Sequence, residues 1–229
     1  MRALIAAGGD PPGKEEFAWL RAHADLLIAA DSGSDWLVRY GVLPDVLLGD
    51  FDSAAADVLA ALDRPGVERV QVPVQKDDTD TMLAARVAVE RGAGEVVLTG
   101  CLGGVRPDHT LANIHVLEWL RRRGARAGIA GSRADLYLVA DGITLRGAVG
   151  DVVSLFPFMG EAEARLLEGG LQYPLSCVFD DVFCGVSNAL TQPLARIAVT
   201  RGRLLVVHGH APLRERVDFL SALQYNVGK

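Results

Sequence analysis

From Arg2 to about Ala130 the sequence alternates short apolar runs with longer segments of helical periodicity, and this alternation constrains the fold more than any other feature. The apolar runs are Ala3–Ala7, Leu26–Ala30, Val46–Leu48, Val70–Val72, Val96–Thr99 and Ala127–Ala130. The periodic segments between them are Glu15–His23, Ser34–Tyr40, Ala54–Leu62, Thr79–Arg91 and Leu111–Arg123. Such a pattern is typical of parallel strands connected by helices. It predicts an α/β N-terminal domain with a mainly parallel sheet flanked by helices.

After Gly131 the sequence changes to short β-rich runs separated by glycine. These runs are Leu136–Val139, Ile143–Leu145, Val152–Phe156, Arg196–Thr200 and Leu204–Val207. Their spacing favours an antiparallel sandwich or barrel. We therefore predict an α/β domain over residues 1–128 and an all-β, sandwich or barrel-like domain over residues 129–229.

The composition narrows the classes of function and the compartment. A net charge of −6 with a pI near 5.4 provides no broad basic field for a nucleic-acid backbone or an anionic membrane. The three cysteines form no C-x-x-C pair, which disfavours a disulfide framework and a zinc ribbon. The N-terminal apolar run of about five residues is too short for a signal-peptide core. We expect a cytoplasmic protein that binds neither nucleic acid nor membrane.

Charged residues follow the second to the fifth apolar run, at the ends of the predicted strands. They are Asp31 after the second run, Asp50 and Asp52 after the third, Asp77, Asp78 and Asp80 after the fourth, and Arg106, Asp108 and His109 after the fifth. Ligands of open α/β sheets bind beyond the carboxyl ends of the strands. The sequence therefore predicts a binding site at this edge of the sheet.

Asp50 and Asp52 are two residues apart in Gly49-Asp50-Phe51-Asp52-Ser53. In an extended segment such residues point to the same side, so both carboxylates can converge on one point. Magnesium prefers hard oxygen ligands and is usually held by one or two carboxylates together with substrate phosphates. The pair suits a magnesium site; the alternative is that both are turn and cap residues of the following helix.

The run Lys76-Asp77-Asp78-Thr79-Asp80 begins a predicted helix, and two interpretations stay open. Asp77 as N-cap with Asp80 three residues later resembles a capping box, which is a structural role. Lys76 beside these acids, at the positive end of a helix, also favours phosphate or metal binding.

The run Gly103–His109 supplies a glycine turn, an arginine suited to phosphate oxygens and a proline suited to the first helical turn. Asn113 follows His109 by one helical turn and is expected on the same face. The alternatives are a structural role for Arg106 and a local hydrogen bond for Asn113.

Two other patterns are set aside. Gly8–Glu15 has the spacing of a P-loop, but glutamate stands where serine or threonine would bind magnesium and two prolines lack the N–H groups that hold phosphate. Gly8 and Gly9 still allow a nucleotide to approach the backbone. His208 and His210 have strand spacing for metal ligands, but no third ligand lies near them in the sequence.

Taken in order, these loops resemble the thiamine pyrophosphokinase family over nearly the whole chain. The matching stretches in the first domain are Ala30–Gly33, Pro44-Asp45 with Gly49–Ser53, Lys76–Asp80, and Arg106–His109 with Asn113. Those in the second domain are Val153–Pro157, Gly169–Leu175, Gly185–Asn188 and Gly202–Val207. Two positions depart from the family pattern, because Val105 lengthens the turn before Arg106 and Ala189 replaces an acidic residue.

The resemblance implies a magnesium-dependent enzyme that transfers the diphosphate group of ATP to the hydroxyl of thiamine, giving thiamine diphosphate and AMP. It further implies a homodimer whose thiamine sites lie between subunits. By position, the resemblance implies that Asp50, Asp52 and Asp80 hold magnesium and that Asp31 and Asp108 lie close to the reacting groups. It implies that Arg106 and Lys76 bind phosphate, and that Asp77, Thr79, His109 and Asn113 make other substrate contacts. Ser187 and Asn188 of the partner subunit would bind the thiamine pyrimidine.

Two other functions remain as alternatives. A related diphosphokinase that accepts a 6-hydroxymethylpterin has the same kind of acidic α/β domain. A regulator that binds a nucleotide or thiamine without turnover is the non-enzymatic alternative, although several carboxylates beside an anionic ligand favour catalysis over binding alone.

Overall fold

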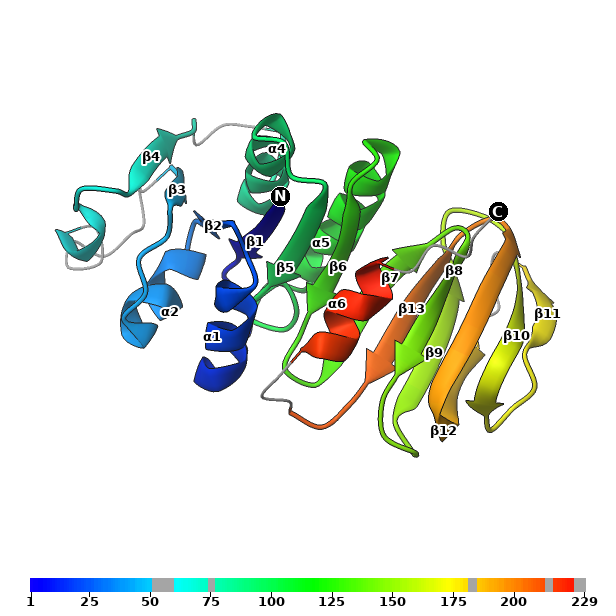
Figure 1. The fold of residues 1–229 in the computed structure, drawn as a ribbon. Coiled ribbons are helices and arrows are strands. Elements are labelled where there is room, and N and C mark those ends of the chain that lie inside the picture. The colour runs from blue at the N-terminus through cyan, green and yellow to red at the C-terminus, as the bar shows by residue number, and fades with distance from the viewer. Residues whose placement is uncertain (51–59, 74–76, 181–184, 213–215, 225–229) are drawn as a thin grey trace. The chain divides into compact units, whose positions relative to one another are not determined.

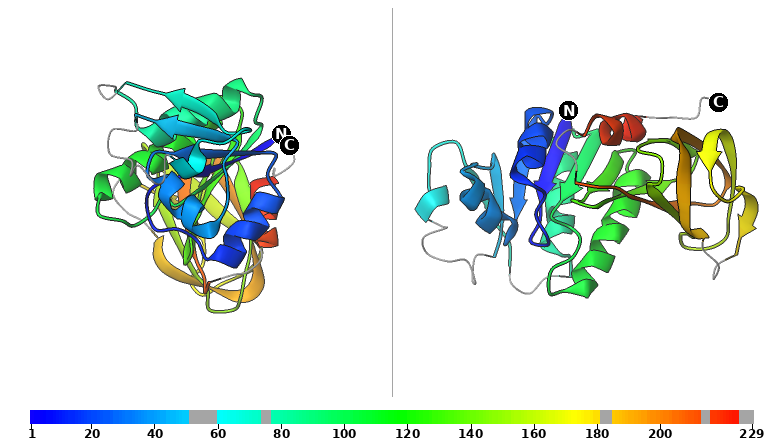
Figure 2. Two further views of the ribbon diagram at one scale, coloured as in Figure 1. Left: turned by 90° about the vertical axis from the view of Figure 1, so that its left-hand side faces the viewer. Right: turned by 90° about the horizontal axis from the view of Figure 1, so that it is seen from below.

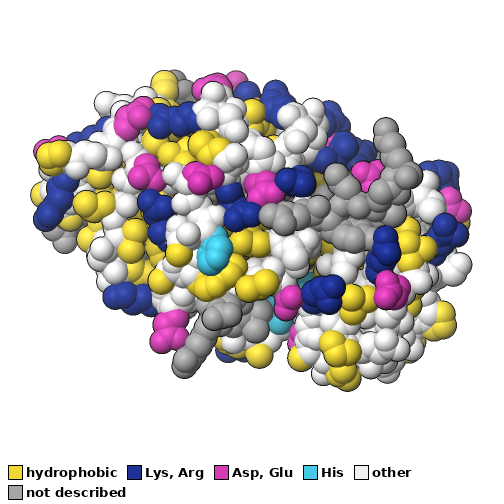
Figure 3. Space-filling view, in the orientation of Figure 1, with side chains coloured by type: hydrophobic (Ala, Val, Ile, Leu, Met, Phe, Trp, Pro, Cys, Tyr) yellow, Lys and Arg dark blue, Asp and Glu magenta, His cyan; other side chains and the backbone are white. Residues whose placement is uncertain are grey.

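The computed structural model describes the chain except residues 51–59, 74–76, 181–184, 213–215 and 225–229 (Figure 1). The chain divides into two compact units, Met1–Gly131 and Ser132–Lys229. Lys and Arg side chains are interspersed with Asp and Glu side chains over the face seen in Figure 3. None of the described helices is long and apolar enough to cross a membrane.

The first unit has a sheet in which every described pair of neighbouring strands is parallel. Its strands are β1 (Arg2–Ala6), β2 (Leu26–Ala30), β3 (Val46–Gly49), β4 (Glu68–Gln71), β5 (Glu95–Thr99) and β6 (Arg126–Ala130). They lie in the order β6-β5-β1-β2-β3-β4. The chain thus runs outward from β1 to β4 and then returns to the other side of β1. The strand order reverses between β1 and β5, where such sheets bind ligands.

Helices cover both faces of this sheet, with α1 and α5 on opposite faces (Figure 2). The helices are α1 (Lys14–Ala22), α2 (Gly33–Tyr40), α4 (Asp80–Glu90) and α5 (Pro107–Arg122). Coverage on both sides explains why β2, β3 and β5 are buried along their whole length and are largely apolar. The ring of Trp36 on α2 is buried, and its Nε1–H donates to the carbonyl oxygen of Ala7 at 2.9 Å.

The second unit is antiparallel in all its described strand pairs. Its elements are β7 (Ala134–Val139), β8 (Gly142–Arg146), β9 (Val152–Pro157), β10 (Ala162–Leu171), β11 (Ser176–Phe179), β12 (Gly185–Arg201), β13 (Leu204–Gly209) and α6 (Val217–Gln224). The order is β7-β13-β9-β12-β10-β11, and β8 also pairs with β12. The first part of β12 pairs with β9 and its later part with β8, so this long strand passes from one group of strands to the other.

Candidate active site

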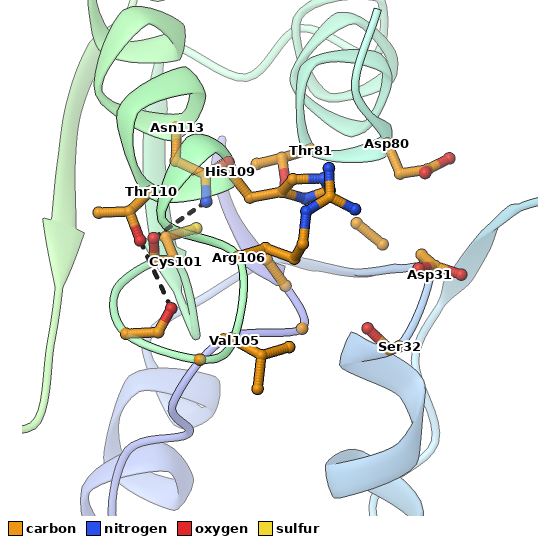
Figure 4. Close-up of a pocket in the computed structure, with 16 residues that line it drawn as sticks. Asp31, Ser32, Asp80, Thr81, Cys101, Val105, Arg106, His109, Thr110 and Asn113 are labelled. Atoms are coloured by element: carbon orange, nitrogen blue, oxygen red, sulfur yellow. Dashed lines mark hydrogen bonds between the residues drawn. The ribbon is translucent and has the colours of Figure 1, made fainter.

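A pocket of about 240 Å³ lies in the first unit, beyond the carboxyl ends of β1, β2 and β5 (Figure 4). The loops after these strands and the first turns of α4 and α5 form its walls. The lining residues are Ala7, Gly8, Gly9, Ala30, Asp31, Ser32, Asp80, Thr81, Cys101, Gly103, Gly104, Val105, Arg106, His109, Thr110 and Asn113. The pocket therefore occupies the point at which the strand order reverses.

The loops after β1 and β5 are joined by backbone hydrogen bonds. The N–H of Gly9 donates to the carbonyl of Gly100 at 2.6 Å, and the N–H of Asp10 donates to the carbonyl of Leu102 at 2.8 Å. A Cβ atom on Gly9 would lie 2.6 Å from the Leu102 oxygen, so only glycine permits this approach. The Asp10 carboxylate also accepts the N–H of Gly104 at 3.1 Å. Asp10 thus fastens the turn that precedes Arg106.

Asp31 directly follows β2 and has a left-handed backbone, with φ of 48°. Few non-glycine residues adopt this conformation, and those that do are concentrated at functional sites. Local hydrogen bonds hold it: its N–H donates to the Leu48 carbonyl at 2.7 Å, and its own carbonyl accepts the N–H of Ser34 at 3.0 Å and the Ser34 hydroxyl at 2.9 Å. These bonds fix the backbone of Asp31, and its carboxylate lies at the pocket on the same side as that of Asp80 (Figure 4).

The N-terminus of α4 differs from the predicted capping box. Thr79 is the N-cap, and its hydroxyl accepts the N–H of Met82 at 3.2 Å. The prediction of Asp77 as N-cap was therefore wrong, because the helix begins later and the threonine hydroxyl is in reach of the free N–H. Asp78 forms an ion pair with Arg86 at 2.9 Å. Asp80, in the first turn, is the acidic residue of this run that lines the pocket.

The N-terminus of α5 carries an exposed ion pair between Arg106 and Asp108. Arg106 Nε donates to Asp108 Oδ1 at 2.9 Å, and Nη2 donates to Oδ2 at 2.5 Å. The bond from the guanidinium lowers the pKa of Asp108 to about 2, so this carboxylate is ionised at neutral pH. Pro107 occupies the first turn of the helix as predicted. Arg106 lines the pocket, whereas Asp108 does not.

His109 and Asn113, one turn apart on α5, both line the pocket. Asn113 is buried, and its Nδ2 donates to the carbonyl of Cys101 at 3.0 Å, which ties α5 to the loop after β5. Burial raises the pKa of the Cys101 thiol, so this group stays protonated and is no nucleophile. Val105 is 95% exposed and lies at the pocket rim.

The pocket offers hard oxygen donors in the carboxylates of Asp31 and Asp80, and this chemistry fits magnesium. Within the described ranges, His, Cys, Asp and Glu side chains form no group of three or more placed to hold a metal ion. Asp50 follows β3, which pairs with β2, but it does not line the pocket. Asp52, predicted as its partner, and Lys76 lie outside the described residues.

The remaining predicted residues lie elsewhere. Asp77 and Thr79 do not line the pocket, and Ser187 and Asn188 belong to β12 of the second unit. The prediction did not include Ser32, Thr81, Cys101 and Thr110 as site residues, although Ser32 directly follows Asp31 in a matching stretch. Small side chains of these types occur at many positions in the sequence, so their type alone does not indicate a site. Only their position next to an acidic or glycine-rich loop could have indicated it.

Comparisons with a family model and with known proteins both identify the thiamine pyrophosphokinases as similar to this chain. Residues 17–129 match the family model described as thiamin pyrophosphokinase, catalytic domain. The thiamine pyrophosphokinase of Bacillus subtilis (strain 168) is 24% identical over 215 residues, which cover 90% of this chain and 98% of that protein.

Solved structures show the same fold. The crystal structure of thiamine pyrophosphokinase from Bacillus subtilis has a TM-score of 0.79 and 24% identity, and covers 92% of this chain and 99% of its own. That of thiamin pyrophosphokinase from Geobacillus thermodenitrificans has a TM-score of 0.74 and 27% identity, with coverage of 91% and 97%. The yeast thiamin pyrophosphokinase has a TM-score of 0.75 at 14% identity, with coverage of 98% and 89%.

Proposed function

The chain belongs to the thiamine pyrophosphokinase family, and from this premise we propose that it transfers the diphosphate group of ATP to the hydroxyl of thiamine, giving thiamine diphosphate and AMP. The observation that carries the proposal is the pocket at the carboxyl ends of β1, β2 and β5. There two carboxylates and an arginine, all within the residues that match the family model, surround one space.

The proposed ATP site is the wall formed by the loops after β1 and β5. Glycines at Gly8, Gly9, Gly103 and Gly104 leave the backbone open to the phosphates. Arg106 presents a planar guanidinium that matches phosphate oxygens, and α5 directs its N-terminus toward the same space. Lys76 remains a further proposed phosphate contact.

We propose magnesium as the cofactor, held by Asp80 together with Asp50 and Asp52, with Asp31 beside them. The carboxylates of Asp31 and Asp80 at the pocket support this proposal through their chemistry. When bound, magnesium neutralises the charge of the phosphates. Such transfers depend on positioning and electrostatic stabilisation rather than on a protein nucleophile.

The proposed step is in-line attack of the thiamine hydroxyl oxygen on the β-phosphorus of ATP. The new bond joins that oxygen to the β-phosphorus, while the bond from the β-phosphorus to the oxygen that it shares with the α-phosphorus breaks, and AMP leaves with that oxygen. Asp31 is the favoured proton acceptor, because it lines the pocket and its backbone is fixed. Asp108 is a weaker candidate because its pairing with Arg106 lowers its basicity.

The acceptor and the assembly complete the proposal. Ser187 and Asn188 of β12 are proposed to belong to the site of the thiamine pyrimidine, between the subunits of a homodimer. The compartment proposed is the cytoplasm. His109 and Asn113 are proposed substrate contacts in the pocket, with Asp77 and Thr79 at the start of α4.

The test is a product assay with purified protein, ATP, magnesium and thiamine. Equal amounts of thiamine diphosphate and AMP, formed only when magnesium is present, are the expected result. AMP formed only with a 6-hydroxymethylpterin would keep the donor site and refute the acceptor. No AMP with either acceptor would refute the enzyme and favour a binding protein.

A further inference from the structure

The first residues of β12 form a β-bulge against β9. Val186 and Ser187 both lie opposite Ser154, between the regular pairs that the two strands form on either side. Ser187 has a left-handed φ of 61°, and its N–H donates to the Ser154 hydroxyl oxygen at 3.1 Å. Both residues of the bulge are exposed. Bulges of this kind re-aim side chains and are frequent next to binding sites, so Ser187 is held in an unusual conformation at the surface.

Asn188, directly after the bulge, is buried. Its side-chain amide forms hydrogen bonds with the backbone of Tyr173, in the way that a neighbouring strand would. Its Oδ1 accepts the N–H of Tyr173 at 2.9 Å, and its Nδ2 donates to the carbonyl of Tyr173 at 3.0 Å. The same Oδ1 also accepts the N–H of Ala189 at 2.9 Å. The carboxamide oxygen therefore has two donors within the fold, and the amide nitrogen has an acceptor there.

Tyr173 follows the end of β10 and is 57% exposed, although its backbone N–H and carbonyl are both bonded to Asn188. A large aromatic ring on a rigid backbone loses little conformational entropy when it meets a ligand, and its face attracts cations. Thiamine, the acceptor in the proposed function, has a planar pyrimidine ring and a positively charged thiazolium ring. The Tyr173 ring therefore offers a surface that fits this acceptor.

We propose that Asn188 is a positioning residue that acts through Tyr173, and that the Tyr173 ring contacts the acceptor beside the bulge of Ser187. The inference rests on the proposed function and changes the role expected for Asn188, because its amide holds the neighbouring chain instead of the thiamine pyrimidine. The direct contact with thiamine is then made by the ring of Tyr173.

A double-mutant cycle tests this inference in the full-length protein. Tyr173→Ala is expected to raise the KM for thiamine about tenfold, the loss of one favourable ring contact, and to leave the KM for ATP unchanged. Tyr173→Phe retains the ring and is expected to behave as the wild type. Asn188→Ala should raise the KM for thiamine as well, and the double variant should be no worse than the more severe single variant. Effects that multiply would overturn the inference, because they would mean that Asn188 acts independently of Tyr173.

The matched control is Val178→Ala, which truncates another exposed side chain of the same unit and is expected to change neither KM. The Tyr173 amide should exchange slowly in the wild type and faster in Asn188→Ala, whatever the activity. If Asn188→Ala does not fold, the variants at the exposed Tyr173 still test whether its ring contacts thiamine.

Calorimetric titration with thiamine alone separates this inference from the proposed function. A wild-type protein that forms no AMP but binds thiamine, with binding weakened in Tyr173→Ala, would refute the reaction and support the ring contact. An active wild type with an unchanged thiamine KM in Tyr173→Ala would support the reaction and overturn the ring contact.

Discussion

At the scale of residues, the pair of Arg106 and Asp108 matters for function rather than for stability. Two hydrogen bonds join the side chains, yet both are more than half exposed. Ion pairs so open to solvent add little to the free energy of unfolding. The pair therefore matters for where it holds the guanidinium, which is at the rim of the pocket next to Val105.

Arg106→Ala is expected to lower kcat/KM about 100-fold, the usual effect of removing one group that stabilises transition-state charge. The melting temperature should stay at the wild-type value. Steady-state kinetics and thermal unfolding check both statements. Arg91→Ala is the matched control, since Arg91 pairs with Glu68 at 2.6 Å near the other end of α4. Equal activity in the Arg106 and Arg91 variants would refute the phosphate role.

Two histidines of the second unit are expected to affect stability with opposite dependence on pH. Burial lowers the pKa of His208, despite Asp151 at 3.5 Å. Burial also opposes protonation of His210, but Asp135, 3.3 Å from its Nε2, outweighs it and raises the pKa. Arg216 shares Asp135 with His210. His210 therefore stabilises the fold below pH 6.5 and loses this contribution as the pH rises through its folded pKa, whereas His208 stabilises it above pH 6.5 and loses its contribution as the pH falls.

Urea unfolding from pH 5 to pH 9 checks this in single variants. His210→Gln should lower the free energy of unfolding most at the acidic end of the range. His208→Gln should lower it most at the alkaline end. The same pH dependence for both variants would contradict the assignment.

The candidate site was predictable where reactive side chains follow the ends of the predicted strands. Asp31, Asp80, Arg106 and His109 were selected by this reasoning, and Asn113 by its helical spacing from His109; the structure places all five around one pocket. The left-handed φ of Asp31 and the hold of Asp10 on Gly104 depend on contacts between distant loops. The sequence carries no local signal for either.

At the scale of elements, the start of α4 determines where Asp80 lies. The cap is Thr79, so Asp80 occupies the first turn and reaches the pocket, while Asp78 pairs with Arg86. Aspartate and threonine are both good caps. The sequence Asp77-Asp78-Thr79-Asp80 therefore allowed more than one N-cap for the helix. Contacts within the fold determine that the N-cap is Thr79.

Thr79→Ala should lower the free energy of unfolding by about 1 kcal/mol, the usual effect of losing an N-cap. Asp77→Ala should change it by less than about 0.5 kcal/mol, as expected at an exposed position with no cap role. Chemical unfolding of both variants measures the difference. A larger loss for Asp77→Ala would restore the capping box that the structure contradicts.

The strands of the first unit were the most predictable elements. The runs predicted at Leu26–Ala30 and Val96–Thr99 differ from β2 and β5 by at most one residue, because strands covered on both faces consist almost wholly of apolar residues. β10 was missed, because a glycine pair interrupts it and its register against β12 shifts repeatedly. The short α6 was missed too, and two turns of helix need tertiary contacts to form.

At the scale of the whole molecule, the proposed reaction assigns donor chemistry to the first unit and acceptor contacts to the second. The family model matches residues 17–129, within the first unit. The similarity to solved structures extends over both units, with 91% of this chain covered by the Geobacillus protein. If the proposed thiamine site takes residues from a partner subunit, it requires an assembly.

Light scattering after size exclusion is expected to give twice the 24.4 kDa of one chain. The measurement should be made at the protein concentration of the activity assay. A mass of one chain under those conditions, with full activity, would rule out a thiamine site between subunits.

The fate of each phosphorus atom of ATP tests the central claim most directly. With label at the α-phosphorus, transfer of a diphosphate group predicts that all label remains in AMP. With label at the γ-phosphorus, it predicts that the label appears in thiamine diphosphate in equal amount to AMP, in a reaction that requires both thiamine and magnesium. Label from the γ-phosphorus in free phosphate, with ADP as the nucleotide product, would contradict the proposed reaction.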